Sequence, residues 1–105
     1  MDLDVTTECN YNWPVTFEWD KGKCRANIQK HAIDFADVPG VFDGLTLTIE
    51  DTRLEYGERR FVTLGMLKGR IVVVVHTERN GKIRVTSARK ATKYETKTYF
   101  EEIAD

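Results

Sequence analysis

The sequence predicts a single α+β domain with two N-terminal helices, an antiparallel sheet of about four strands and a C-terminal helix. Its 105 residues suffice for one domain and are too few for two ordinary ones. Apolar residues follow helical spacing near both ends and two-residue alternation between them, which favours strands in the middle of the chain. Asn80-Gly81, set between two apolar runs, is typical of a two-residue hairpin turn.

The domain is expected to span residues 15–105. Residues 1–14 form a polar lead-in that is compatible with a flexible tail. Val15, Phe17 and Trp19 alternate with polar residues, so a short first strand opens the domain.

A first helix is expected over residues 21–31, capped by the short carboxylate of Asp20. Three residues at positions i, i+4 and i+7 form its predicted inward stripe: Cys24, Ile28 and His31. One position earlier, the same spacing gives a polar, cationic stripe made of Lys23, Asn27 and Lys30.

A second, short helix is expected after Asp34, which is a cap candidate. Its apolar face consists of Phe35, Val38, Val41 and Phe42. Pro39-Gly40 lies inside this segment. Proline removes a backbone donor and glycine adds chain entropy, so we expect this helix to be short or broken.

The predicted strands are residues 45–49, 61–65 and 71–75, followed by the strand after Asn80-Gly81. The two-residue turn fixes a register that pairs Arg79 with Lys82, Thr77 with Arg84, His76 with Val85 and Val74 with Ser87. That register places His76 and Ser87 on one face and Arg84 on the other. The last helix is expected over residues 91–103, with Tyr94, Thr98 and Tyr99 facing inward.

The net charge of −1 argues against a general nucleic-acid binder, but the charges are segregated along the chain. Residues 21–31 carry a net charge of +4, and residues 59–97 carry +9. The remaining segments are acidic. A pattern of this kind builds a local basic face on a near-neutral protein.

Several classes of protein are not expected. No apolar run approaches the ~18 residues of a membrane span, and the acidic N-terminus lacks a signal pattern, so we expect a cytoplasmic protein. Cys9 and Cys24 are expected to be free thiols, with Cys24 in the core. Spacings typical of zinc, calcium or phosphate-loop sites are missing from the sequence, so we expect no metal and no cofactor.

Three separated motifs in the same order resemble a known family. Residues 17–31, which contain Phe17-Glu18-Trp19-Asp20 and Lys30-His31, resemble the opening signature of the BrnT toxins of bacterial type II toxin–antitoxin modules. Residues 57–61 are similar to that family's Glu-Arg-Phe segment, and residues 84–92 to its basic ending. The resemblance covers about residues 17–100.

The resemblance implies a RelE-like fold and a ribonuclease that inhibits translation without a cofactor. It also implies a cognate antitoxin with a ribbon-helix-helix DNA-binding domain, so that operator DNA is reached only through the antitoxin. The expected substrate is RNA, free or on the ribosome, and no membrane partner is expected.

Cleavage of RNA by its own 2′-OH requires a base, an acid and cations that hold the charged transition state. Arginine supplies charge but stays protonated, so the candidates for the base are Glu58, Lys23, Lys90 and His76. The expected catalytic residues are Lys23, Glu58, Arg60, Arg89 and Lys90. The expected RNA-binding residues are Trp19, Lys30, Arg84 and His76.

Each of these side chains also has a plainer interpretation. Trp19 shares a strand face with Phe17, which favours a core anchor over a ring that stacks a base. His76 suits proton transfer or sheet packing, and Glu58 suits a base or a group that orients an arginine. For the whole chain, the alternative function is a non-catalytic module that binds RNA, the ribosome or the antitoxin.

Overall fold

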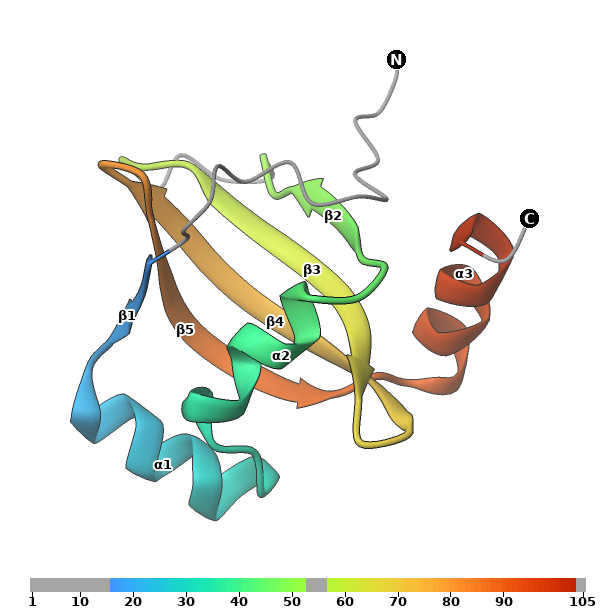
Figure 1. Cartoon of the computed structure of the whole chain (residues 1–105), viewed down its shortest axis with the longest axis horizontal. Helices are drawn as coiled ribbons and strands as arrows, with labels where there is room; N and C mark the ends of the chain where they lie inside the picture. The colour runs from blue at the N-terminus through green and yellow to red at the C-terminus, as the bar shows by residue number, and fades with distance from the viewer. Residues whose placement is uncertain (1–15, 53–56, 104–105) are drawn as a thin grey trace.

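The structure, a computed structural model, describes residues 16–52 and 57–103; the predicted lead-in of residues 1–14 lies outside them. Five strands form one mixed sheet in the order β1-β5-β4-β3-β2. Figure 1 shows this sheet with helices on both sides. The strands are β1 (Thr16–Trp19), β2 (Leu47–Glu50), β3 (Arg60–Leu67), β4 (Arg70–Arg79) and β5 (Lys82–Lys90). The helices are α1 (Lys21–His31), the 3-10 helix η1 (Phe35–Asp37), α2 (Val38–Phe42) and α3 (Lys93–Ile103).

The α+β class and the C-terminal helix are confirmed, but the prediction of about four antiparallel strands is wrong. The sheet has five strands because β1 pairs in parallel with β5, joining Glu18 to Arg84 and Trp19 to Val85. The other three pairings are antiparallel. Turn residues identify strands that are neighbours in sequence, whereas the pairing of residues 16–19 with 82–85 has no local signal.

Helix α1 has the predicted bounds, and Asp20 caps it by accepting a hydrogen bond from the Lys23 backbone N–H at 2.9 Å. Cys24 is buried as expected. Ile28 is 41% exposed, so its predicted inward position is wrong. Asn27, which the periodicity placed on the polar stripe, is buried instead. Its amide forms hydrogen bonds inside the fold, and these offset the cost of burial.

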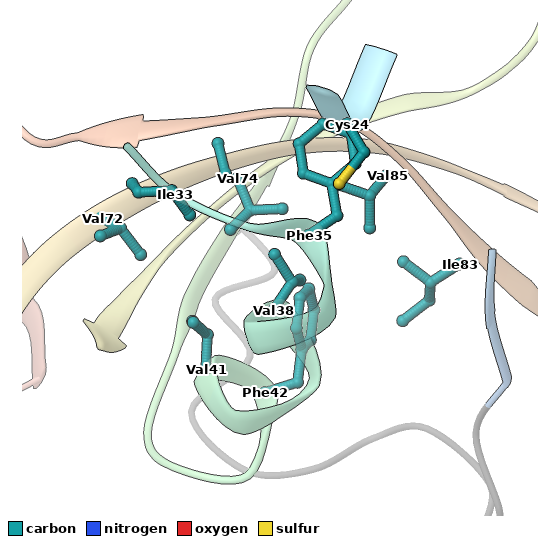
Figure 2. Packing of buried hydrophobic residues seen from close by; sticks show 11 residues of the cluster. Cys24, Ile33, Phe35, Val38, Val41, Phe42, Val72, Val74, Ile83 and Val85 are labelled. Carbon is teal, nitrogen blue, oxygen red and sulfur yellow. The ribbon is translucent and has the colours of Figure 1, made fainter. Parts of the chain in front are cut away.

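The second helical segment is divided as Pro39-Gly40 predicted. Asp34 accepts from the Ala36 backbone N–H at 2.9 Å and starts η1, and a five-residue α2 follows. Phe35, Val38 and Val41 are buried against the sheet. Figure 2 shows these side chains meeting Val72, Val74 and other strand residues in one apolar cluster.

A smaller apolar cluster lies on the other face of the sheet. Tyr99 of α3 packs there with Leu47, Leu64 and Val73, and its hydroxyl donates to the Leu45 carbonyl at 2.9 Å. The prediction that Tyr94 also faces inward is wrong, because this side chain is 78% exposed. Helix α3 contacts β2 and β3, at one side of this face.

The β4–β5 hairpin turns at Asn80-Gly81, whose φ angles of 55° and 76° match the predicted turn. The predicted register holds from Arg79–Lys82 to His76–Val85. It then shifts by one residue, so that Ser87 pairs with Val75 rather than Val74. Thr86 is the unpaired extra residue, and its hydroxyl donates to the Val75 carbonyl at 3.0 Å. The prediction that Ser87 and His76 share a face is therefore wrong.

Among the helices that the structure describes, none is long and apolar enough to cross a membrane.

Candidate functional site

The bulge at Thr86 brings two arginines of β5 to one face of the sheet. Arg84 and Arg89 are five residues apart, so a regular strand would direct them to opposite faces. With one extra residue between them, both lie on the face opposite the cluster of Figure 2. Arg60 of β3 joins them, because Arg60 and Arg84 both pair with Thr77. We call Arg60, Arg84 and Arg89 the cationic sheet face.

These three arginines are spread over a surface wide enough for several groups of one ligand. Only β4 separates Arg60 from Arg84, so their backbones lie about 10 Å apart. Side-chain exposure is 35% for Arg84 and 39% for Arg89, so both guanidinium groups reach solvent. Ser87 lies on the same face between them and is half-buried.

Arg84 is held by a carboxylate on the neighbouring strand. Its guanidinium lies 3.5 Å from the Glu18 carboxylate, and the two residues face each other in the parallel β1–β5 pair. Both side chains are about one-third exposed, so this contact orients Arg84 more than it stabilises the fold.

Arg89 has a firmer partner in Glu95 of α3. Two parallel hydrogen bonds of 2.9 Å join its guanidinium to both carboxylate oxygens. Glu95 also accepts from the Thr92 backbone N–H, and Thr92 accepts from the Glu95 N–H, which forms a capping box at the start of α3. The hydrogen bond with Arg89, helped by Thr92, lowers the pKa of Glu95 to about 2. The same pairing raises the pKa of Arg89, so the pair stays charged.

A largely apolar groove of about 450 Å³ adjoins Arg89. It lies between α3 and the two strands β2 and β3, with Ile49, Val62 and Leu64 on the strand side. Tyr94, Glu95 and Thr98 line the helix side. The exposed ring of Tyr94 offers a flat apolar surface at the rim of this groove. Helical periodicity predicted that Tyr94 faces the core, so the sequence pattern did not identify Tyr94 as a surface residue of this groove.

Several of the other predicted site residues lie away from the cationic sheet face. Lys23 and Lys30 are exposed on α1, which covers the opposite face of the sheet. Trp19 packs edge-on against Phe35 at 6.3 Å, which fits the core-anchor interpretation. Lys90 follows Arg89 in β5 and lies on the α1 side, opposite Val72.

Glu58 lies in the loop before β3, where it contacts Arg79 at 3.7 Å. Arg79 alternates along β4 with Thr77 and so lies on the same face as Arg60 and Arg84. Glu58 is exposed and borders the cationic sheet face. Its position therefore suits either of the two roles expected from the sequence.

His76 is fully buried and is not part of any exposed surface. Its ring stacks on Phe61 and meets the edge of Phe42, and its Nε2 is 2.8 Å from the Thr63 hydroxyl. Burial lowers the pKa of His76 to about 4, because the charged imidazolium is disfavoured away from water. The structure thus places His76 in the core, as its sheet-packing interpretation expected, and away from the arginines.

Within residues 16–52 and 57–103, no group of three or more His, Cys, Asp or Glu side chains is placed to hold a metal ion. The cationic sheet face itself carries guanidinium groups and the Ser87 hydroxyl, with carboxylates at its border. The partners Glu18 and Glu95 were not foreseen, because each reaches its arginine through strand pairing or a helix start rather than through a spacing motif.

The fold and this face define an α+β protein with arginines gathered on one side of a mixed sheet, an arrangement suited to binding a polyanion. A comparison with protein families narrows the class. The family model described as "Ribonuclease toxin, BrnT, of type II toxin-antitoxin system" matches residues 19–95. The chain belongs to this family of ribonuclease toxins, whose type II system supplies a protein antitoxin as partner. A comparison with curated proteins found no match.

Proposed function

We propose that this protein is a metal-independent endoribonuclease that cleaves RNA on the cationic sheet face and thereby inhibits translation. The observation that carries the proposal is the bulge at Thr86, which sets Arg84 and Arg89 on one face with Arg60. Bulges of this kind recur next to active sites, where they redirect a side chain to the other face. A phosphodiester suits such a face, because guanidinium groups bind phosphate oxygens through charge-assisted hydrogen bonds.

In this proposal the arginines hold the scissile phosphate while the neighbouring 2′-OH attacks phosphorus and the P–O5′ bond breaks. The products are a 2′,3′-cyclic phosphate and a 5′-OH, which takes its proton from the protonated base or from water. The transition state carries more negative charge on its phosphoryl oxygens than the ground state, so guanidinium groups stabilise it selectively. Removal of one such positioned donor costs about 3 kcal/mol of transition-state stabilisation. Arginine stays protonated, so another group must accept the 2′ proton.

Glu58 is the base we assign to this step, because it is an exposed carboxylate at the border of the face. Glu18 is the second carboxylate within reach, at 3.5 Å from Arg84. Glu95 is unsuited to the role, since its pKa of about 2 makes it a poor proton acceptor.

The ion pair with Glu95 leaves some N–H donors of the Arg89 guanidinium unused. Nη1 donates to Glu95 and to the Lys90 carbonyl, and Nη2 donates once to Glu95. A guanidinium has five N–H donors, so Nε and the second hydrogen of Nη2 remain for a phosphate oxygen. Arg89 is thus oriented for binding and still able to bind.

The groove beside Arg89 supports a place for RNA bases. Nucleobases stack on aromatic rings with about 1–3 kcal/mol per base, and Tyr94 presents such a ring. The apolar strand residues below it, among them Ile49 and Val62, suit the flat faces of bases rather than phosphates.

The antitoxin is proposed to carry a ribbon-helix-helix domain and to cover the cationic sheet face, with operator DNA bound only through it. The charge of Arg60, Arg84 and Arg89 and the apolar groove beside Arg89 support this surface as its docking site. The ribosome is a second proposed partner, because a ribonuclease that inhibits translation would meet its RNA there, and the cytoplasm is the proposed compartment.

The test is RNA cleavage by the purified protein in the presence of EDTA. We expect cleavage by the wild type and a loss of about 100-fold in Arg84→Ala and in Arg89→Ala. Arg25→Ala is the matched control, because Arg25 is exposed on α1 at the other side of the sheet. A wild type that binds RNA in a salt-sensitive way and leaves it intact would contradict the proposal and favour the non-catalytic binding module.

A further inference from the structure

A second basic site lies on the face of the sheet that is opposite to the cationic sheet face. It is a pocket of about 260 Å³ formed where the end of α1, the β3–β4 turn and the end of β5 meet. Figure 1 shows these three segments at the lower edge of the molecule. We call it the rear cationic pocket, defined by the rim residues Lys68, Arg70 and Lys90 and the floor residues Ile33, Leu67 and Val72.

The rim carries more positive charge than its surroundings balance. Asp37 is the one acidic residue among the lining residues, and its carboxylate lies 3.6 Å from the Lys68 ammonium. Within the described part of the chain, neither Arg70 nor Lys90 forms an ion pair. Two cations that face one pocket without a counter-charge repel each other, and a bound anion relieves that repulsion.

Strand pairing fixes this arrangement. Arg70 pairs with Leu67, and Lys90 pairs with Val72, so all four point to the same face of the sheet. Lys68 lies in the turn between β3 and β4, with a φ of 52°, and lines the same pocket. The cations therefore come from three separate segments onto one apolar floor, as in a pocket for a ligand with a charged group and an apolar body.

We propose that the rear cationic pocket binds a phosphate group of a nucleotide. Its volume lies just below the range of pockets that enclose drug-sized ligands, so it suits one nucleotide-sized group. Arginine and lysine on the rim match the phosphate, and Ile33, Leu67 and Val72 match the face of a base.

The source of that phosphate is the RNA substrate, and this assignment rests on the proposed ribonuclease function. Arg89 and Lys90 are consecutive residues on opposite faces of β5, so the two basic sites are separated by the thickness of one strand. Both residues lie at the C-terminal end of β5, beyond the part that pairs with β1, so a strand of RNA that passes this end can place one phosphate at Arg89 and another at Lys90. The pocket then adds affinity at a distance from the cleaved bond.

The experiment measures binding of a short 2′-O-methyl oligoribonucleotide, which lacks the attacking hydroxyl and stays intact. Fluorescence anisotropy is recorded over a range of salt concentrations for the wild type and for Arg70→Gln, Lys90→Gln and the double variant. Lys97→Gln is the matched control, because Lys97 is an exposed lysine on α3. Thermal unfolding checks that each variant is folded.

We expect the double variant to bind about tenfold more weakly at low salt. Its slope of log affinity against log salt should be smaller by about 0.7, since the pocket holds one phosphate and each phosphate contact on a single strand contributes about 0.7. The control should match the wild type. Because the oligonucleotide is not cleaved, this result does not depend on whether the protein is a ribonuclease.

Adenosine 5′-monophosphate titrated into the labelled protein forms the second arm. Shifts of the Ile33 and Val72 backbone amide resonances in the wild type that are lost in the double variant, together with unaltered RNA binding, would support the phosphate site with a free nucleotide as its source. Wild-type affinity of the double variant for both probes would overturn the proposal. So would weaker antitoxin binding with unaltered binding of both probes, since the pocket would then be a protein contact.

Discussion

The side-chain amide of Asn27 in α1 pairs with the backbone of Ala88 in β5 as a neighbouring strand would. Nδ2 donates to the Ala88 carbonyl at 2.9 Å, and Oδ1 accepts from the Ala88 N–H at 3.1 Å. Nδ2 also donates to the Ile33 carbonyl at 3.0 Å. Strand β1 pairs with β5 only up to Val85, so Asn27 satisfies backbone groups that β1 does not reach.

Asn27→Ala should therefore destabilise the fold far more than an average surface change. Three buried backbone groups lose their partner, and an unsatisfied buried group costs about 1–3 kcal/mol, so we expect a total loss of about 3 kcal/mol. Urea unfolding measures it. Gln29→Ala, an exposed change in the same helix, should stay within about 0.5 kcal/mol of wild type. Equal effects of the two changes would refute the structural role of Asn27.

Glu95 should act on cleavage through Arg89 and on stability through the α3 cap, and two variants separate these effects. Glu95→Gln keeps an acceptor for the Thr92 N–H and loses the ionic pair with Arg89, so cleavage should fall about tenfold. Thr92→Ala removes the hydroxyl of the cap and leaves the Arg89 pair, so stability should fall by about 1 kcal/mol while cleavage is retained. The measurements are cleavage rates and urea midpoints.

Arg89→Lys should cleave RNA about as poorly as Arg89→Ala. Lysine keeps the positive charge but cannot form two parallel hydrogen bonds with Glu95 and still present directed donors. Its rate should stay within about threefold of Arg89→Ala in the same assay. A rate near wild type would mean that charge alone suffices at this position.

Burial of His76 should make stability depend on pH in a defined window. Its folded pKa of about 4 lies below the ordinary value of 6.5, so between these values the unfolded chain binds a proton that the folded chain does not. Stability is complete above pH 6.5 and falls as the pH falls, by about 2 kcal/mol between pH 6.5 and pH 5. Urea unfolding across this range tests it.

His76→Gln is the control for that titration, because glutamine can still bond to the Thr63 hydroxyl and does not titrate. We expect most of the slope between pH 6.5 and pH 5 to disappear in this variant. Glu95 contributes to the pH dependence of stability at lower pH, between about pH 4.5 and pH 2. Its pKa is lowered in the fold, so protonation of Glu95 removes the stabilisation. An unchanged slope would assign the effect to other groups.

Position 65 should not tolerate a side chain as small as a methyl group, because Val41 of α2 packs directly on Gly65. A Cβ there would lie 2.6 Å from Val41 Cγ1 and 3.2 Å from Thr46 Cγ2. Gly65→Ala should cost about 1–3 kcal/mol by overpacking. Gly40→Ala, inside α2 with open space around it, should stabilise the fold by about 0.5–1 kcal/mol. Thermal unfolding of both variants should show shifts of opposite sign.

The sequence alone determined the elements that depend on local chemistry. Asp20 and Asp34 start their helices because short carboxylates accept from exposed first-turn N–H groups. Asn80-Gly81 sets the hairpin because both residues tolerate a positive φ. The family was also readable from its motifs, and the match over residues 19–95 confirms it.

Only the tertiary structure decided which charged residues lie together. The basic block of residues 59–97 is continuous in sequence, yet the sheet sends Arg84 and Arg89 to one face and Arg70 and Lys90 to the other. One unpaired residue, Thr86, reverses the face of the residues that follow it, and no propensity signals that insertion. Likewise, Asn27 has the spacing of a surface residue. It is buried and bonds to the Ala88 backbone because β1 ends at Trp19 and leaves that part of β5 without a neighbouring strand. Long-range pairing, unlike a cap or a turn, is set by the balance of the whole sheet.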